Sequence, residues 1–202
     1  MIIENLGTRV ADVWKGLRPE TKKMIVGALQ TSSAASSSPS KQFYDAHADW
    51  ELSSLLSALD EQSSVKEVRA DAAKFNDIKL LAATCARMLE MRSASAEVFI
   101  QLATRALRDN DYDKLDKLAD RLEEYYSPGE IAEIARQTEL AQIRAIAFET
   151  LTQLPVQAIA PLLDDALYAE IAVAALEQKA YEFNSEEARD LLEYTEMRPD
   201  KP

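Results

Sequence analysis

The sequence has few glycines, one cysteine and one histidine, and each scarcity excludes a class of structure or site. Glycine occurs only four times in 202 residues, so the tight turns that join β-hairpins are almost excluded. Cys85 is the single cysteine, which rules out an intrachain disulfide framework and a cysteine-based metal cluster. Because Cys85 shares helical spacing with Ile78, Leu81 and Met88, we expect it to be a buried packing residue.

Long apolar segments are missing as well. No uninterrupted apolar run approaches the roughly 18–20 residues that a membrane-spanning helix needs. The N-terminal residues lack the basic region and the apolar stretch of a secretory signal. We therefore expect a soluble, cytoplasmic protein that does not associate with membranes.

The residues that are plentiful favour an all-α fold. Hydrophobic residues make up 47% of the chain, which is ordinary for a globular domain. Ala, Leu, Glu, Gln, Lys and Arg dominate from residue 41 onward, and these are the stronger helix formers. Apolar residues recur at helical spacing over about residues 3–16, 19–29, 41–60, 77–91, 95–108, 113–126, 138–153 and 165–183.

Two segments carry the signature of a helix start. Ser64 with Glu67 has the spacing of a capping box, and so does Ser127 with Glu130. In the second segment Pro128 suits the first helical position. We expect a helix to begin at each serine.

The Ser-rich segment 31–40 is the first compositional boundary. It has no periodic apolar residues and many hydroxyl side chains, which is typical of a flexible linker. We therefore expect an N-terminal helical hairpin over residues 1–30, a linker over 31–40 and an α-helical domain over 41–198.

The net charge of −12 is spread unevenly along the chain. Residues 1–40 carry five basic and three acidic groups, a balance of +2, so residues 41–202 carry −14. Direct nucleic-acid binding is disfavoured, because its affinity comes mainly from cations that neutralise phosphates. An acidic surface instead suits a protein partner with a basic surface.

Two segments repeat with an offset of 28 residues. Residues 142–149 align with residues 170–177, and the intervening segment is long enough for a turn, a short helix and another turn. A period near 30 residues with an Ala-rich helix in each copy indicates stacked helical hairpins.

Residues 127–195 resemble HEAT-like and armadillo-like helical repeats. The resemblance is carried by residues 138–148 and 163–176, where an acidic cap, an aliphatic-basic pair and an Ala-rich run recur. Ile143 and Arg144 match the pair, whereas Ala172 replaces the basic residue in the second copy. The resemblance implies a right-handed α-α superhelix of stacked hairpins that binds other macromolecules. The alternative is an irregular multi-helix bundle, which stays open for residues 41–126.

No catalytic constellation is recognisable. His47 is the only histidine, and with Glu51 at i+4 it offers two metal ligands where a stable zinc site usually needs three or four. Phosphate-binding glycine loops and nucleophile elbows are absent from the sequence. We therefore expect no catalytic residue, cofactor or metal.

The interpretation that follows is a non-enzymatic protein-interaction or scaffold module with an acidic helical-repeat surface. Tyrosine buries a large area and keeps a polar tip, which suits an interface. The candidate contact residues are Glu123, Glu124, Tyr125 and Tyr126. The alternative is a helical domain that binds a small molecule or a metal in an inter-helix cavity near His47 and Trp50. This alternative includes an enzyme that uses the same cavity.

Overall fold

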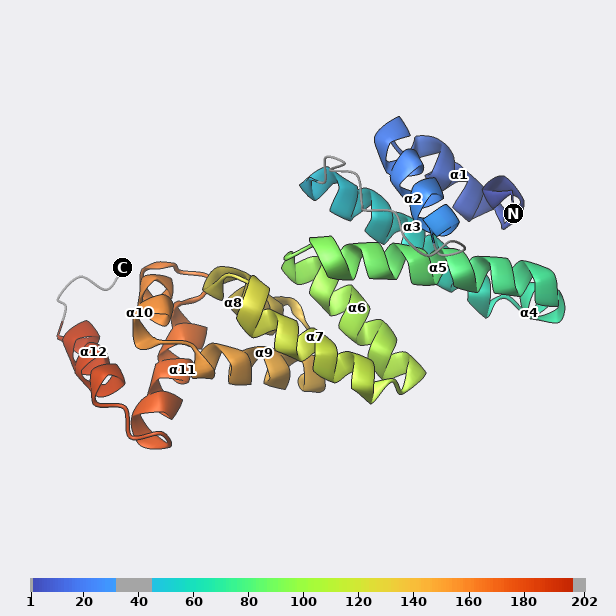
Figure 1. Ribbon diagram of the computed structural model, residues 1–202. Coiled ribbons are helices and arrows are strands. Elements are labelled where there is room, and N and C mark those ends of the chain that lie inside the picture. Colours follow the sequence, from blue (N-terminus) through green and yellow to red (C-terminus); the bar gives the residue numbers. More distant parts are fainter. Residues whose placement is uncertain (1, 32–44, 198–202) are drawn as a thin grey trace. The chain divides into compact units, whose positions relative to one another are not determined.

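The computed structural model of the protein describes residues 2–31 and 45–197 (Figure 1). Every regular element in these two ranges is an α-helix or a short 3₁₀-helix, and neither range contains a strand. The expectation of an all-α protein is therefore confirmed. The chain divides into two compact units, Met1–Ser93 and Ala94–Pro202, which are called unit 1 and unit 2 below.

Unit 1 is organised around one central helix, α3. Its elements are the 3₁₀-helix η1 (Ile3–Asn5) and the helices α1 (Thr8–Gly16), α2 (Pro19–Thr31), α3 (Ala46–Ser64), α4 (Lys66–Ala70) and α5 (Ala72–Arg92). Helix α3 contacts α1, α2, α4 and α5, and four of its leucines are fully buried. The expected buried role of Cys85, on α5, is confirmed.

The expected N-terminal hairpin packs within unit 1. Val10 of α1 and Ile25 of α2 are fully buried, so both helices contribute to the core that α3 organises. Thr31 is the last residue of α2. The rest of the expected Ser-rich linker lies outside the described residues.

Unit 2 is a succession of short helices that pack on their neighbours. They are α6 (Ala96–Asp109), α7 (Tyr112–Tyr125), α8 (Pro128–Gln137), α9 (Ala141–Gln153), α10 (Val156–Ile159), the 3₁₀-helix η2 (Ala160–Asp164), α11 (Ala169–Tyr181) and α12 (Glu186–Glu196). Helix α6 contacts α7 and α8, α9 contacts α7, α8 and α11, and α11 contacts α12, so each of these helices packs on others close to it in the chain (Figure 1).

The two expected capping boxes have different outcomes. The prediction for Ser127 is confirmed: its hydroxyl accepts the N–H of Glu130, and Pro128 occupies the first turn of α8. The carboxylate of Glu130 accepts the N–H of Ala96 at 2.6 Å instead, at the start of α6. Near Ser64 a new helix opens as expected, α4 at Lys66, but Ser64 does not cap it: Ser64 ends α3, and its hydroxyl donates to the carbonyl of Glu61.

Two expected helix starts are also displaced. Helix α5 begins at Ala72, well before residue 77, because Asp71 accepts the N–H of Lys74 and caps the helix there. Helix α11 begins at Ala169 rather than near residue 165. There the Asp165 side chain accepts the N–H of Leu167 at 2.9 Å and holds the preceding residues in a turn.

The 28-residue offset reappears in the helix boundaries. Helices α9 and α11 are each 13 residues long, and their first residues, Ala141 and Ala169, are 28 positions apart. The copies differ at Arg144 and Ala172: Arg144 is exposed, whereas Ala172 is fully buried. An arginine at position 172 would bring an ionised side chain into the core, which explains why the basic residue is missing there.

Three cations of unit 2 donate hydrogen bonds to backbone carbonyls at the C-terminal ends of other helices. In each case the donor lies on a later helix than the one it braces, and a cation at this end also interacts favourably with the helix dipole. The donors and acceptor residues are Arg144 to Thr138 at 2.6 Å, Lys179 to Thr152 at 2.7 Å and Arg189 to Ala180 at 3.2 Å. They brace the ends of α8, α9 and α11.

We expect the Lys179→Met variant to lower the free energy of unfolding of unit 2 by about 1–2 kcal/mol, because the carbonyl of Thr152 loses a charged donor. Urea unfolding followed by circular dichroism measures the loss. Tryptophan fluorescence serves as an internal reference, since both tryptophans, Trp14 and Trp50, lie in unit 1. The matched control is Lys117→Met on the exposed face of α7, and an equal loss in both variants would contradict the brace.

Candidate functional site

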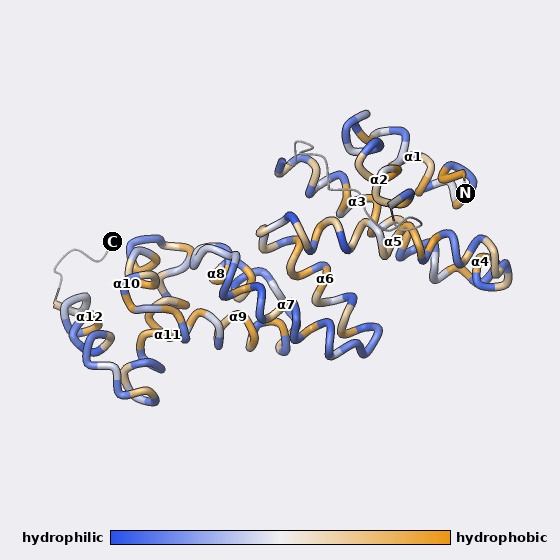
Figure 2. The backbone as a smooth tube through the Cα atoms, in the orientation of Figure 1, coloured by the Kyte–Doolittle hydropathy of each residue, from blue (hydrophilic) through white to orange (hydrophobic). Residues whose placement is uncertain are grey.

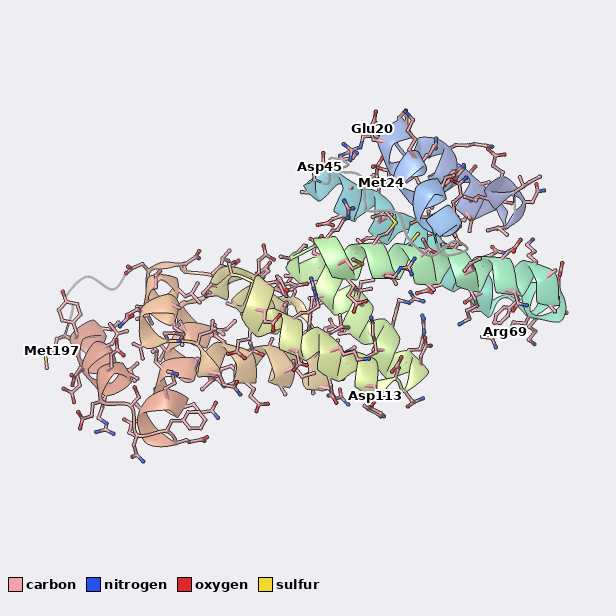
Figure 3. The ribbon with its side chains drawn as sticks, viewed as in Figure 1. Glu20, Met24, Asp45, Arg69, Asp113 and Met197 are labelled. Atoms are coloured by element: carbon pink, nitrogen blue, oxygen red, sulfur yellow. The ribbon has the colours of Figure 1, made fainter. Side chains whose placement is uncertain are left out.

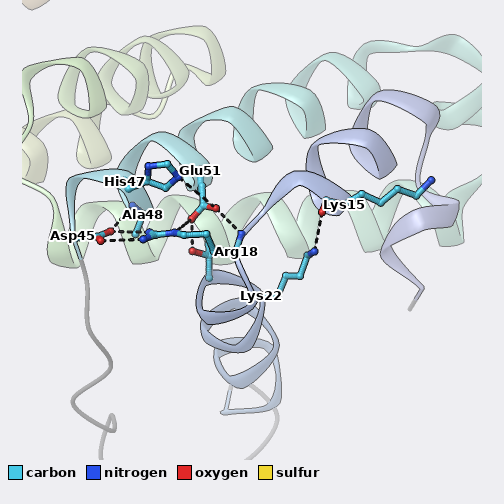
Figure 4. A network of polar contacts seen from close by, with 8 residues as sticks. Lys15, Arg18, Lys22, Asp45, His47, Ala48 and Glu51 are labelled. Atoms are coloured by element: carbon cyan, nitrogen blue, oxygen red, sulfur yellow. Dashed lines mark hydrogen bonds and ion pairs between the residues drawn. The ribbon is translucent and has the colours of Figure 1, made fainter.

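The start of α3 and the start of α2 meet in a polar cluster inside unit 1 (Figure 4). Asp45 precedes α3 and caps it by accepting the N–H of Ala48 at 2.9 Å. Six residues after Asp45, Glu51 points inward and is only 1% exposed. Thr21 reaches the cluster from α2, and Arg18 is the residue just before that helix.

Glu51 is buried with its oxygens satisfied. Its Oε1 accepts the backbone N–H of Arg18 at 2.6 Å, and its Oε2 accepts Nε of the same residue at 3.0 Å. The hydroxyl of Thr21 also donates to Oε2. A buried carboxylate is tolerated when it is paired and hydrogen-bonded in this way.

Arg18 holds a second carboxylate at the same time. Its Nη1 and Nη2 donate to the two oxygens of Asp45 at 3.0 and 2.8 Å, which is the bidentate geometry that a planar guanidinium favours. Arg18 therefore joins the cap of α3 to the buried Glu51. The guanidinium fixes the start of α2 on the start of α3.

These contacts shift the pKa values of all three charged groups. Hydrogen bonds from Arg18 hold the pKa of Asp45 far below its ordinary value. Burial alone would raise the pKa of Glu51, but the hydrogen bonds from Thr21 and Arg18 outweigh it and lower the pKa. Hydrogen bonds to the two carboxylates raise the pKa of Arg18 in turn. Both acids are thus held in the ionised form.

The residues of the alternative hypothesis, His47 and Trp50, are placed on the surface of α3. The His47 ring lies 5.7 Å from the Trp50 ring, and the Trp50 side chain is 65% exposed. His47 Nε2 is 3.9 Å from Glu51 Oε1, but that carboxylate is already engaged by Arg18 and Thr21. The spacing predicted the proximity of His47 and Glu51 correctly and missed the inward partners of Glu51.

One sequence signal pointed to the buried cluster. Glu51 stands between Ala48 and Leu55 on the apolar face of α3, where an ionisable residue needs an internal partner. The identity of that partner is not readable from local spacing, because Arg18 lies 33 positions earlier.

The net charge of the protein belongs to unit 2. Residues 1–93 carry twelve basic and twelve acidic side chains, whereas residues 94–202 carry eleven basic and twenty-three acidic ones. Unit 1 is therefore neutral and unit 2 carries −12. The acidic surface expected from the sequence is confined to one of the two units.

Helix α7 displays part of this charge on one face. Five exposed carboxylates recur at spacings of three and four residues, and none of them pairs with another described side chain. They are Asp113, Asp116, Asp120, Glu123 and Glu124. The helix is mainly hydrophilic outside its inward leucines (Figure 2), and Asp113 marks the start of the row in Figure 3. We call these five residues the α7 acidic face.

The two tyrosines at the end of α7 have different environments. Tyr125 is 58% exposed, and the guanidinium of Arg121 lies 4.5 Å from its ring centre. Tyr126 is half-buried and packs edge-on against Phe99 at 5.9 Å. Of the four sequence-predicted contact residues, Glu123, Glu124 and Tyr125 face solvent, and Tyr126 packs partly inward.

A second ion cluster braces unit 2. Arg136 donates from Nε and Nη2 to the two oxygens of Glu133 at 2.6 Å each, on α8. These bonds lower the pKa of Glu133 to about 2, with a contribution from Gln137 and Tyr168. Because Tyr168 directly precedes α11, the cluster ties α8 to the start of that helix.

No protein-family model, no curated protein and no solved structure matches the chain. In residues 2–31 and 45–197, no helix is both long and apolar enough to cross a membrane. Within the same ranges, no three His, Cys, Asp or Glu side chains form a group that could hold a metal ion. Function therefore has to be inferred from the charge and geometry of the described surfaces.

Replacing Arg18 by methionine should destabilise unit 1 by about 3 kcal/mol, because Glu51 would stay buried without its charged partner. Urea unfolding followed by tryptophan fluorescence measures the loss. Arg9→Met is the matched control, since its ion pair with Glu61 is exposed and should contribute under about 1 kcal/mol. Similar losses in the two variants would show that the cluster does not hold unit 1 together.

Unit 1 should also lose stability in acid. Asp45 and Glu51 have lowered pKa values in the folded state, so the unfolded state binds more protons once the pH falls below about 4. Their contribution is therefore complete above the ordinary carboxylate range and disappears as the pH falls through the folded values.

Unfolding midpoints in urea between about pH 2 and pH 6, followed by tryptophan fluorescence, measure this dependence. It should be shallower in Arg18→Met, because both carboxylates lose their charged partner. Arg136→Met is the control: it releases Glu133 in unit 2 and should leave the fluorescence profile of unit 1 unchanged. A profile in Arg18→Met as steep as that of the wild type would contradict the assignment.

Proposed function

We propose that unit 2 is a non-enzymatic protein-interaction module that binds a partner through an acidic surface. The observation that carries the proposal is the confinement of the whole net charge of −12 to residues 94–202. A surface of one sign accelerates encounter with partners of the opposite sign and disfavours partners of the same sign. A basic protein surface is the complementary partner.

The α7 acidic face is the contact surface that we propose. Its carboxylates are exposed and lack intramolecular partners among the described residues, so binding to lysine or arginine side chains breaks no existing ion pair. Tyr125 adds exposed aromatic area beside the row, and Arg121 already lies over its ring. Tyr126 supports the corner by packing on Phe99.

We further propose that unit 2 is a short HEAT-like stack with a right-handed α-α superhelical arrangement. Two features support this proposal: the equal lengths of α9 and α11, and the 28-residue offset between them. Each of these helices packs on a shorter element just before it, α8 for α9 and η2 for α11. Such stacks bury their apolar faces against neighbouring hairpins and offer extended surfaces to partners.

The triple variant Asp116→Asn, Asp120→Asn, Glu123→Gln tests the α7 acidic face. Affinity capture from a native lysate should recover basic proteins with the wild type and lose them with the variant. A captured protein, once purified, should bind the variant at least about tenfold more weakly, because three exposed charges have been removed from the contact.

The matched control carries three neutralised carboxylates elsewhere in unit 2: Glu139→Gln, Glu149→Gln and Glu177→Gln. These side chains are exposed and belong to α9, α11 and the segment before α9. The control should keep the captured proteins. Equal loss in both triple variants would mean that only the total charge matters, and the α7 acidic face would no longer be the contact.

A further inference from the structure

The last helical pair of the described chain is its most acidic part. Residues 169–197, which contain α11, the following turn and α12, carry eight acidic and two basic side chains. This balance of −6 is half of the net charge of −12 and is concentrated in 29 residues.

Both cations of this segment are engaged with backbone. Lys179 donates to the carbonyl of Thr152, and Arg189 donates to the carbonyl of Ala180. Neither cation pairs with a carboxylate of α12, because each donates to a backbone carbonyl at the end of another helix. Among the described side chains, the carboxylates of Glu186, Glu187, Asp190 and Glu193 thus form no ion pair with either cation.

Helix α12 has a distinct inner and outer face. Ala188 is fully buried, and Leu191 and Leu192 are half-buried on the same side, toward α11. The outer side carries exposed residues at helical spacing: Glu186, Asp190, Glu193, Tyr194 and Met197. We call these five residues the α12 outer face.

The α12 outer face combines charge with exposed apolar area. Tyr194 is 60% and Met197 78% exposed, and Met197 stands clear of the helix end in Figure 3. Glu186, Asp190 and Glu193 make no hydrogen bond or ion pair with another described side chain. The face is about 16 Å long, which corresponds to three turns of helix.

We propose that the α12 outer face binds a basic amphipathic helix of a partner protein, with lysine or arginine side chains flanking an apolar stripe. Charge complementarity selects this occupant: the carboxylates on the face require cations, and Tyr194 and Met197 require apolar area between those cations. An α-helix presents both at spacings of three and four residues, which matches the spacing on α12. Nucleic acids and anionic membrane surfaces carry the same sign as α12 and are repelled.

This inference rests on the proposed function of unit 2 as a module for basic partners. It adds a second contact surface with its own recognition chemistry. The α7 acidic face offers a row of carboxylates beside Tyr125, whereas the α12 outer face adds an apolar pair at the end of the helix. The two surfaces can therefore be tested on one protein with separate variants.

The experiment uses the full chain and a fluorescein-labelled synthetic peptide of about two heptads, with leucine on one face and lysine on the other. Fluorescence anisotropy measures its affinity. A peptide of the same pattern with glutamate in place of lysine is the probe control and should not bind. Two variants address the face: the double variant Asp190→Asn, Glu193→Gln and the single variant Tyr194→Ala.

Each of these variants should weaken binding about tenfold, because one removes the charge and the other an exposed aromatic anchor. The matched control Glu170→Gln, Glu177→Gln removes two exposed carboxylates from α11 and should change the affinity less than twofold. Circular dichroism of each variant checks that the helical fold is retained. Equal weakening by the α11 control would overturn the proposal.

A charge exchange provides the stricter test. Asp190→Lys, Glu193→Lys should lose the lysine peptide and gain binding to the glutamate peptide. Failure to gain that binding would overturn the assignment of the α12 outer face, even if the neutral variants behave as expected.

The α7 triple variant, measured with the same peptide, separates the two proposals. Weakening by α7 variants alone would overturn the inference about α12 and leave the proposed function in place. No binding by any form of the protein, or no response to either set of variants, would contradict both. Self-association of the wild type that is lost in Tyr194→Ala, seen by sedimentation, would replace the basic partner by a second copy of the chain.

Discussion

A helix leaves its first N–H groups and its last C=O groups without intrahelical partners, and a chain of short helices has many such ends. Ionised side chains meet this demand in both units. Glu51 accepts the backbone N–H at the start of α2, Asp45 caps α3, and Glu130 accepts the N–H at the start of α6. Carboxylates at helix starts and cations at helix ends both agree with the sign of the helix dipole. The remaining structure depends on these contacts because they orient each helix on the next.

The acidity of unit 2 comes from its excess of acidic side chains, twenty-three against eleven basic ones. Four of its eleven cations are engaged within the unit: Arg144, Lys179 and Arg189 contact carbonyls, and Arg136 is held by Glu133. The five carboxylates of the α7 acidic face, and Glu186, Asp190 and Glu193 of α12, face solvent without partners among the described side chains. Unit 1 has equal numbers of acidic and basic side chains, and its Arg18 binds the carboxylates of two acids at once. The two units differ in net charge because unit 2 carries twenty-three acidic side chains and unit 1 carries twelve, while their cations are nearly equal in number.

Local features were predictable from the sequence, and long-range ones were not. Ser127 and Pro128 carry their own signal, and α8 begins there as expected. The displaced start of α11 depends on a turn made by Asp165, a residue that suits either a turn or a helix start. The partner of Glu51 is 33 positions away, so its spacing on α3 showed only that a partner was needed. The boundary after Ser93 has no Gly- or Pro-rich segment to mark it, which is why the confinement of charge to one unit emerged only from the fold.

In the three hydrogen bonds from Arg144, Lys179 and Arg189 to helix-end carbonyls, the donor always comes later in the sequence than the acceptor. This order has a consequence during synthesis of the chain. Each donor is synthesised after the helix end that it serves, by 6 residues for Arg144, 27 for Lys179 and 9 for Arg189. The carbonyls at the ends of α8, α9 and α11 therefore receive these donors only after a later helix, α9, α11 or α12, has been made. The last of the three donors, Arg189, is supplied by α12.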